Sequence, residues 1–119
     1  MPPPDVRTYL PLTPLAFQVL LALAGPERHG YAIIQEIEAH TAGAVRLRTG
    51  TLYTVLQRLL DERLLDESRA RRTEGDDERR RYYTLTPLGR DVLEAEARRL
   101  EALVDLARRK RVLGRSSRA

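Results

Sequence analysis

The chain has 119 residues, of which 21 are Lys or Arg and 17 are Asp or Glu, so its formal net charge is +4. This length predicts one small domain that buries only about 60 to 70% of its unfolded surface, and the basic excess permits binding to nucleic acid. The lack of cysteine excludes disulfides, thiolate metal sites and a cysteine nucleophile, and the lack of an apolar span of ~20 residues or a signal peptide indicates a cytoplasmic protein.

Residues 1–11 are predicted to form a flexible arm, because four of them are proline and proline removes backbone donors, although one ordered turn fits residues 6–10. Thr13 can cap the first helix, with Pro14 at its first position, and Gly25-Pro26 ends it. This helix is apolar nearly all round. We therefore expect it to be buried, partly in the domain core and partly against a second copy of the chain.

A second helix is predicted from about residue 30 to Thr41, with three isoleucines facing inward and Ala42-Gly43 at its end. His29 stands alone just before this helix, where a histidine more commonly caps or packs than binds a ligand or acts as a base. Tyr31 has two interpretations that the sequence leaves open. It could reach a DNA phosphate, or it could fill a gap between helices.

The third helix, around residues 50–60, has two contrasting faces. The face that must pack on a core carries Leu52, Val55, Leu56, Leu59 and Leu60. The opposite face carries polar side chains that can bind phosphates or base edges, namely Tyr53, Thr54, Gln57 and Arg58.

The positive charges around this helix favour a negatively charged partner. Three arginines and no acid occur between Val45 and Leu60, and Arg48 directly precedes the helix. Thr49 or Thr51 can cap the helix, so that its N-terminal amides face any nearby phosphate. The segment predicts a DNA recognition helix; an ordinary amphipathic surface helix is the alternative.

Two strands joined by a turn follow. Leu64-Leu65 and then residues 68–73 suggest the first and residues 79–85 the second, which after a helix-turn-helix is the pattern of a wing. They carry six arginines, Arg69, Arg71, Arg72, Arg79, Arg80 and Arg81. The tip, residues 74–78, holds four acids. These acids either form a solvated loop or restrain the arginines until DNA competes for them.

Thr86 and Pro87 predict the start of a last helix of about 26 residues, long enough to extend ~39 Å. Apolar residues recur along it at steps of four and three, the spacing of a coiled-coil seam. The seam consists of Leu93, Ala97, Leu100, Val104 and Ala107. An apolar seam on a projecting helix needs a partner, so we expect a homodimer. The basic stretch that follows is predicted to be a disordered tail.

Four short motifs occur in a specific order. They are Leu-Thr-Pro-Leu at residues 12–15, His-Gly-Tyr at 29–31, Gly-Thr-Leu-Tyr at 50–53 with Arg58-Leu59, and Arg-Tyr-Tyr-Thr-Leu-Thr at 81–86 with Gly89. Over roughly residues 10–112 this order resembles the PadR family of bacterial transcriptional regulators, in particular the smaller members with a single C-terminal helix. The resemblance implies a winged helix-turn-helix, dimerisation through the C-terminal helix with help from the first, and repression relieved by a small molecule or stress. It also implies that Tyr53 is the recognition-helix tyrosine and that Tyr31 lies near the DNA backbone.

Two positions depart from the family's pattern. Thr54 stands where proline commonly follows the tyrosine, and Arg48 stands where serine often precedes the motif. Both belong to the expected DNA-facing surface, so the operator sequence cannot be carried over from relatives. The chain also has no tryptophan. This removes the mode in which some small members hold planar aromatic ligands between tryptophans at the dimer interface.

The sequence thus predicts a mainly α fold with a small β-hairpin. We expect a flexible arm at residues 1–11, a winged helix-turn-helix DNA-binding domain at 12–85, a C-terminal dimerisation helix at 86–112 and a basic tail at 113–119. The predicted DNA-binding residues are Tyr31, Arg48, Thr49, Thr51, Tyr53, Thr54, Gln57, Arg58, Arg72, Arg79, Arg80 and Arg81. Expected partners are double-stranded DNA, a second copy of the chain and a small-molecule inducer at the dimer interface; no cofactor or metal is expected.

Two other classes of function fit the sequence less well. Enzyme activity lacks support, because neither His29 nor His40 has a carboxylate at a sequence spacing that indicates an acid–base pair. Glycine-rich phosphate loops and metal-ligand clusters are also absent from the sequence. A winged-helix module that binds protein instead of DNA is the alternative. Such a module would not need an acid-free recognition helix or six wing arginines.

Overall fold

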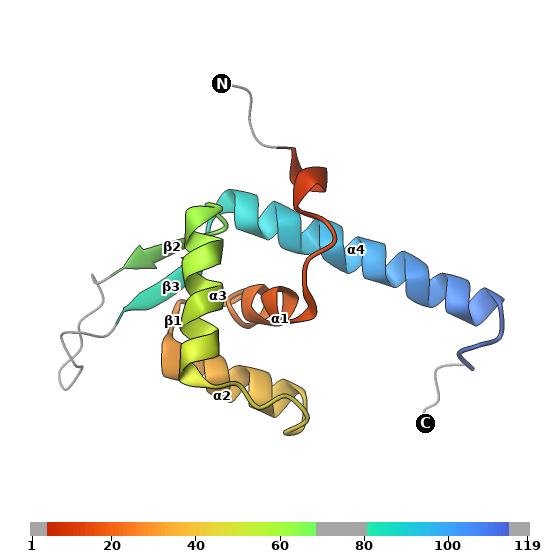
Figure 1. Ribbon diagram of the computed structural model, residues 1–119. Coiled ribbons are helices and arrows are strands. Elements are labelled where there is room, and N and C mark those ends of the chain that lie inside the picture. The colour runs from red at the N-terminus through yellow and green to blue at the C-terminus, as the bar shows by residue number, and fades with distance from the viewer. Residues whose placement is uncertain (1–4, 69–80, 115–119) are drawn as a thin grey trace.

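The computed structural model describes residues 5–68 and 81–114. In chain order its elements are η1 (Val6–Tyr9), α1 (Pro14–Ala22), β1 (Arg28–His29), α2 (Gly30–His40), α3 (Thr49–Asp61), β2 (Leu65–Ser68), β3 (Tyr82–Leu85) and α4 (Pro87–Arg109). Helices α2 and α3 form the helix-turn-helix, β2 and β3 form the base of the wing, and α4 follows (Figure 1). The predicted fold, mainly helical with a small sheet, is confirmed.

One hydrophobic core joins the first three helices to the start of α4. Its fully buried side chains include Val19, Leu20, Leu23, Ile33, Ile37, Leu52, Leu56, Leu59, Leu64, Leu65 and Val92. Three of them form the predicted inner face of α3, whereas Val55 and Leu60 at the margin of that face are half-buried. The core therefore fixes which face of α3 points outward.

The sheet has three antiparallel strands in the order β1-β3-β2. Leu65 pairs with Leu85 and Ser68 with Tyr82, while β1 adds the pairs Arg28 with Tyr83 and His29 with Tyr82. Strand β1 was not predicted, because two residues carry no alternation that could indicate a strand. Strand β2 begins at Leu65, within the stretch from Leu64 onward that suggested the first wing strand. The predicted strand residues between 69 and 80 lie outside the described residues.

Three helices begin with side-chain caps where the sequence predicted them. The Thr13 hydroxyl accepts from the Ala16 N–H at 3.1 Å, and the Thr86 hydroxyl accepts from the Gly89 N–H at 2.9 Å. His29 Nδ1 accepts from the Ala32 N–H at 3.2 Å, so this histidine caps α2. These bonds satisfy helix-start amides that have no partner within the helix.

Helix α3 corrects one prediction. Neither Thr49 nor Thr51 caps it, because the helix already begins at Thr49 and Arg48 occupies the N-cap without a side-chain bond. Thr49 and Thr51 both lie within the first helical turn. Among the described residues, no side chain therefore caps the N-terminal amides of α3.

Two motif glycines permit close approaches between elements. A Cβ on Gly89 would collide with the carbonyl oxygen of Leu64, so glycine lets the start of α4 lie against the chain that leads into β2. A Cβ on Gly30 would lie 2.6 Å from the hydroxyl oxygen of Tyr53. Glycine at position 30 thus leaves room for the Tyr53 side chain at the start of α2.

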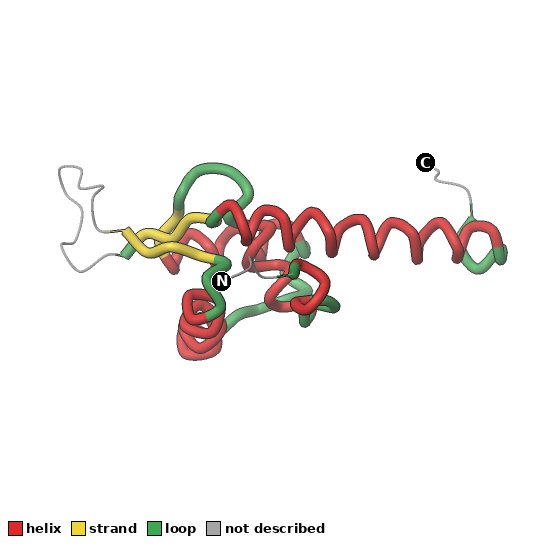
Figure 2. Tube along the Cα trace, turned by 90° about the horizontal axis from the view of Figure 1, so that it is seen from above, coloured by secondary structure: helices red, strands yellow, loops and turns green. Residues whose placement is uncertain are grey.

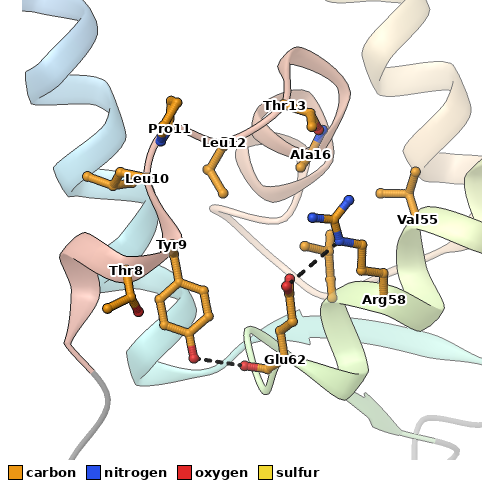
Figure 3. A pocket seen from close by; sticks show the side chains of 11 residues that line it. Thr8, Tyr9, Leu10, Pro11, Leu12, Thr13, Ala16, Val55, Arg58 and Glu62 are labelled. Carbon is orange, nitrogen blue, oxygen red and sulfur yellow. Dashed lines mark hydrogen bonds and ion pairs between the residues drawn. The ribbon is translucent and has the colours of Figure 1, made fainter.

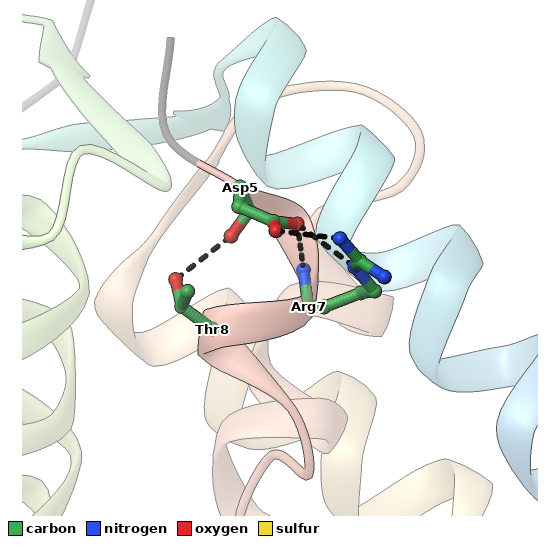
Figure 4. A network of polar contacts seen from close by, with 3 residues as sticks. All are labelled: Asp5, Arg7 and Thr8. Carbon is green, nitrogen blue, oxygen red and sulfur yellow. Dashed lines mark hydrogen bonds and ion pairs between the residues drawn. The ribbon is translucent and has the colours of Figure 1, made fainter. Parts of the chain in front are cut away.

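The N-terminal segment contains one ordered turn, at the place where the sequence allowed one. In the η1 turn, the Asp5 carboxylate accepts from the Arg7 N–H at 2.9 Å and the Asp5 carbonyl oxygen accepts from the Thr8 hydroxyl at 2.7 Å (Figure 4). Val6, Tyr9 and Leu10 pack against the core, and η1 lies against α4 (Figure 1). The ordered turn that the sequence allowed at residues 6–10 is therefore present, and its apolar side chains anchor it to the core.

Helix α4 has two distinct halves. Its first half packs on the core through Val92 and Leu93, and its second half extends away from the other elements in both views (Figures 1 and 2). Leu93 is buried within its own domain, so its assignment to an intermolecular seam is wrong. The helix ends at Arg109, three residues before the predicted boundary at 112. No helix within the described ranges combines the length and the apolar character needed to cross a bilayer.

Candidate nucleic-acid interface

The outward side of α3 carries four polar residues, which we call the recognition face: Tyr53, Thr54, Gln57 and Arg58. All four are exposed, whereas Leu52, Leu56 and Leu59 on the opposite side are buried. The helical period predicted this division, and the core enforces it. The recognition face is therefore presented by a helix whose rotation about its axis is set by packing.

The start of α2 lies beside the Tyr53 side chain and positions it. Its hydroxyl lies close to Gly30 at the start of that helix, and 46% of the residue remains exposed. Tyr31 follows Gly30 directly and is 64% exposed. This exposure favours the surface interpretation of Tyr31 over the one in which it fills a gap between helices. Both tyrosines thus belong to the corner where the start of α2 meets α3.

The other three residues of the recognition face already have partners, on α3 or directly after it. The Thr54 hydroxyl donates to the Gly50 carbonyl oxygen at 3.0 Å, and Gln57 Nε2 donates to Asp61 Oδ1 at 2.9 Å. Arg58 Nε lies 3.7 Å from Glu62 Oε2. The acid-free stretch of the sequence ends at Leu60, so the next two residues supply the acids that the sequence analysis left out. Such exposed pairs contribute little to stability and can exchange for other partners.

The start of α3 adds a second kind of contact surface. Arg48, Thr49 and Thr51 are all exposed, and the first helical turn contains no acid. Amides at a helix start carry a partial positive charge when nothing caps them. Together with the Arg48 guanidinium, this end of α3 can receive a phosphate.

Only one predicted wing arginine lies within the described residues. Arg81 Nε is 3.2 Å from Glu67 Oε2, so the side chain pairs across β3 and β2. Next to it, Tyr83 is buried, and burial together with the nearby Glu67 carboxylate raises the pKa of its hydroxyl to about 12. The His29 ring meets Tyr82 edge to face, with centroids 5.7 Å apart. Arg72, Arg79 and Arg80 lie outside the described residues.

The second half of α4 exposes an apolar surface. Of the predicted seam, Ala97 and Val104 are exposed, while Leu100 and Ala107 are half-buried. Leu103 and Leu106 are exposed as well, although the strict seam spacing did not select them. Large apolar side chains gathered on one projecting helix are typical of an interaction surface.

A buried polar group in α4 also escaped the sequence analysis. Glu96 has a fully buried side chain; its carboxylate accepts from Arg99 Nε at 2.6 Å and from the Leu12 N–H at 3.3 Å. We call these three groups the buried clamp. The Arg99 guanidinium, followed by the Leu12 amide, holds the pKa of the Glu96 carboxyl below its ordinary value against the opposing effect of burial. The only sequence signal was its position three and four residues after Leu93 and Val92, on the core face of the helix.

Comparisons with known proteins agree with this geometry. Residues 19–95 match the model of the Transcriptional regulator PadR-like family. The transcriptional regulator Rv3488 of Mycobacterium tuberculosis is 38% identical over 86 residues, which cover 71% of this chain and 74% of that protein. Among solved structures, Bacillus subtilis PadR in complex with operator DNA is similar with a TM-score of 0.58 and 22% identity, over 68% of this chain and 46% of that one. Bordetella bronchiseptica BpsR, whose DNA binding is regulated by 6-hydroxynicotinic acid, is similar with a TM-score of 0.60 and 25% identity, over 87% and 67% of the two chains.

Proposed function

We propose that this chain, a DNA-binding transcriptional regulator that belongs to the PadR-like family, acts as a ligand-responsive repressor and binds a pseudopalindromic operator as a homodimer. The observation that carries the proposal is the recognition face of α3. It presents four exposed polar side chains on a helix that the core holds in place. PadR-like proteins are regulators of transcription and not enzymes, which agrees with the prediction from the sequence.

In this proposal α3 lies in the major groove. Tyr53, Thr54, Gln57 and Arg58 contact base edges and flanking phosphates, and Gln57 and Arg58 exchange their acidic partners for DNA. Arg48, Thr49, Thr51 and the amides at the helix start bind one phosphate, while Tyr31 contacts the backbone nearby. Arg81, with Arg72, Arg79 and Arg80, contributes phosphate contacts from the wing.

The homodimer forms through the second half of α4. Ala97, Leu100, Val104 and Ala107 pack against a second copy, with Leu103 and Leu106 widening the contact. Leu21 supports a contribution from α1, because it is a large apolar residue that stays 43% exposed on an otherwise well-buried helix. A two-fold dimer would place two recognition helices one DNA turn apart, about 34 to 36 Å, which requires an operator with matching symmetry.

Ligand response is the least direct part of the proposal. The support for it is that an aromatic acid regulates the DNA binding of BpsR, a similar protein. The prediction from the sequence places an inducer at the dimer interface. The described residues also offer a separate pocket of about 310 Å³ beside the recognition helix, with Arg58 and Glu62 in its lining (Figure 3).

The experiment is a fluorescence anisotropy titration with a labelled duplex from the region upstream of the chain's own gene. At a fixed salt concentration, we expect this duplex to bind about 10³-fold more tightly than a scrambled duplex of equal length. Equal and weak binding of both duplexes would contradict operator recognition. It would favour the alternative in which the winged helix binds protein.

A further inference from the structure

The recognition face touches the start of α2 at one very close point. Gly30 is the first residue of α2 and is buried. A Cβ built on it would lie 2.6 Å from the Tyr53 hydroxyl oxygen and 3.1 Å from Tyr53 Cζ. Both distances are below the van der Waals separation of heavy atoms, roughly 3.5 Å. Tyr53 can therefore occupy its observed position only because residue 30 has no side chain.

The hydroxyl end of Tyr53 is turned toward the interior of the domain. It lies over the buried Gly30, and it is also near Tyr83, a buried residue of β3. Burial, the Glu67 carboxylate and the Tyr53 hydroxyl together raise the pKa of the Tyr83 hydroxyl to about 12. Since 46% of Tyr53 is nevertheless exposed, the surface that this residue offers to a partner consists mainly of ring carbons.

A methyl group at position 30 is expected to move the Tyr53 ring and to leave the fold in place. The atoms that it would meet belong to the far end of a flexible side chain, which can swing toward solvent. The next neighbour, Leu52 Cδ2, would lie at 3.5 Å, an ordinary contact distance. Residue 30 is also helical, and alanine is a better helix former than glycine. Gly30 thus controls the geometry of the recognition face and not the stability of the domain.

We propose that Gly30 is a positioning residue for DNA recognition. It seats the Tyr53 hydroxyl against the start of α2, so that the Tyr53 ring faces the operator and contacts a thymine methyl group. That methyl group is the apolar feature that base edges present in the major groove. A ring whose hydroxyl faces the protein makes an apolar contact there and selects thymine over the other bases. The contact with DNA rests on the proposed function, because it assumes that α3 lies in the major groove.

The first experiment tests the positioning without DNA. Carbon-13 labelling of the five tyrosine rings gives an NMR spectrum in which the Tyr53 signal is identified by its absence from Tyr53→Phe. Gly30→Ala should shift this signal and leave that of Tyr9 in η1 unchanged. Gly25→Ala is the matched control, because a Cβ on Gly25 would meet nothing within 4 Å and should shift neither signal. An unchanged Tyr53 signal in Gly30→Ala would overturn the positioning role.

Thermal unfolding separates positioning from packing. Gly30→Ala should unfold at or above the temperature of the natural sequence, because alanine favours the helix and the displaced ring opens no core cavity. A midpoint lowered by about 10 °C or more would show that Gly30 packs the core, and would overturn its assignment to the recognition face.

Operator binding then tests the coupling between the two residues. By fluorescence anisotropy, Gly30→Ala should lower the affinity for the operator about tenfold and leave the affinity for the scrambled duplex unchanged, since phosphate contacts dominate nonspecific binding. The same substitution in the Tyr53→Phe protein should cost about twofold or less relative to Tyr53→Phe alone. Without the hydroxyl, only the 3.1 Å approach to Cζ must be relieved. Equal losses in the two backgrounds would overturn the proposal.

Thymine replacement identifies the group on DNA. Deoxyuridine lacks the methyl group of thymine, so each thymine of one half-site is replaced by it in turn. One replacement should lower the affinity of the natural sequence about threefold to fivefold, the loss expected for one methyl contact, and should have no effect on Tyr53→Ala. Replacements that weaken both proteins equally, or neither, would overturn the thymine contact.

Failure of the proposed function gives a different result. A Tyr53 signal that shifts in Gly30→Ala, in a protein that binds operator and scrambled duplexes equally, would support the seating of the hydroxyl by Gly30. It would contradict operator recognition and with it the thymine contact. The two failures are therefore distinguishable.

Discussion

Two arginine-glutamate pairs of similar sequence spacing occur in very different surroundings. Arg58 on α3 and Glu62, which directly follows that helix, are 3.7 Å apart, with side chains 68% and 37% exposed. Arg99 and Glu96 on α4 are 2.6 Å apart, with side chains 37% and 2% exposed. The first pair is loose and open to solvent, whereas the second is tight and also receives a backbone N–H from Leu12.

This difference shows that burial decides what such a pair does. An exposed pair contributes little to stability because water competes for both charges, so its arginine can be transferred to DNA or to a ligand. A buried carboxylate cannot lose its partners without a large desolvation cost, so it holds the N-terminal segment against α4. The exchangeable pair, Arg58 and Glu62, thus lies at the recognition helix. The fixed pair, Glu96 and Arg99, lies in the part of α4 that contacts the N-terminal segment.

The largest effect is expected where α4 leaves the core. Leu100→Asp would place a charge in the proposed dimer contact at a cost of about 3 kcal/mol or more per dimer. Sedimentation should show a monomer, and operator binding should fall toward nonspecific levels because only one half-site is engaged at a time. Arg98→Asp is the control, since Arg98 is exposed and lies on the opposite side of the helix from Leu100. A Leu100→Asp protein that stays dimeric would show that α1 or the N-terminal segment holds the pair together.

The buried clamp should respond strongly to loss of its charge. Glu96→Gln keeps the shape but weakens the bonds to Arg99 and Leu12, and we expect the free energy of unfolding at pH 7 to fall by about 2 kcal/mol. The measurement is urea denaturation, and the matched control is Glu94→Gln in the exposed pair with Arg98, where the expected loss is below about 1 kcal/mol. Equal losses in both variants would contradict the distinction between buried and exposed pairs.

The pH dependence of the clamp has a definite sign. The pKa of the Glu96 carboxyl is held below its ordinary value of 4.5 in the folded chain, mainly by the Arg99 guanidinium. Above pH 4.5 the carboxyl is ionised in both states and its contribution is fully present. As the pH falls below 4.5, the unfolded chain takes up the proton first, so the contribution is lost as the pH approaches the lowered folded value. The difference in stability between the natural sequence and Glu96→Gln should shrink over this range.

An intermediate effect is expected on the recognition face. Tyr53→Ala should weaken operator binding by about 1 to 3 kcal/mol while leaving unfolding nearly unchanged, because the side chain is half exposed and its loss opens no core cavity. Anisotropy titrations measure the binding, and Tyr53→Phe tests whether the hydroxyl beside Gly30 is required. Operator affinity that is the same for all three proteins would remove Tyr53 from the interface.

The features that sequence reasoning predicted are local ones. A cap such as Thr13 or Thr86 acts within three residues, and the two faces of α3 follow from the helical period, so both could be inferred from neighbouring residues. The missed features join distant parts of the chain. Strand β1 exists through its pairing with β3, and the burial of Glu96 depends on Leu12, which lies 84 positions away in the sequence. Leu93 fits the spacing of a seam and of a core equally well, and only the packed domain distinguishes them.

The smallest effect is expected from breaking the exposed ion pair between Arg58 and Glu62. Glu62→Gln removes the carboxylate beside Arg58 and one negative charge near the proposed path of the DNA backbone, so operator affinity should rise by about 0.5 kcal/mol. The gain should decrease at higher salt, because screening weakens the repulsion that the substitution removes. Glu94→Gln is the matched control, since it removes the same charge from an exposed pair on α4 and should leave DNA affinity unchanged. Stability should change by less than about 0.5 kcal/mol in either variant. Weaker operator binding by Glu62→Gln would mean that the Glu62 carboxylate positions Arg58 for DNA instead of competing with it, and the loose pair would then be part of the binding surface itself.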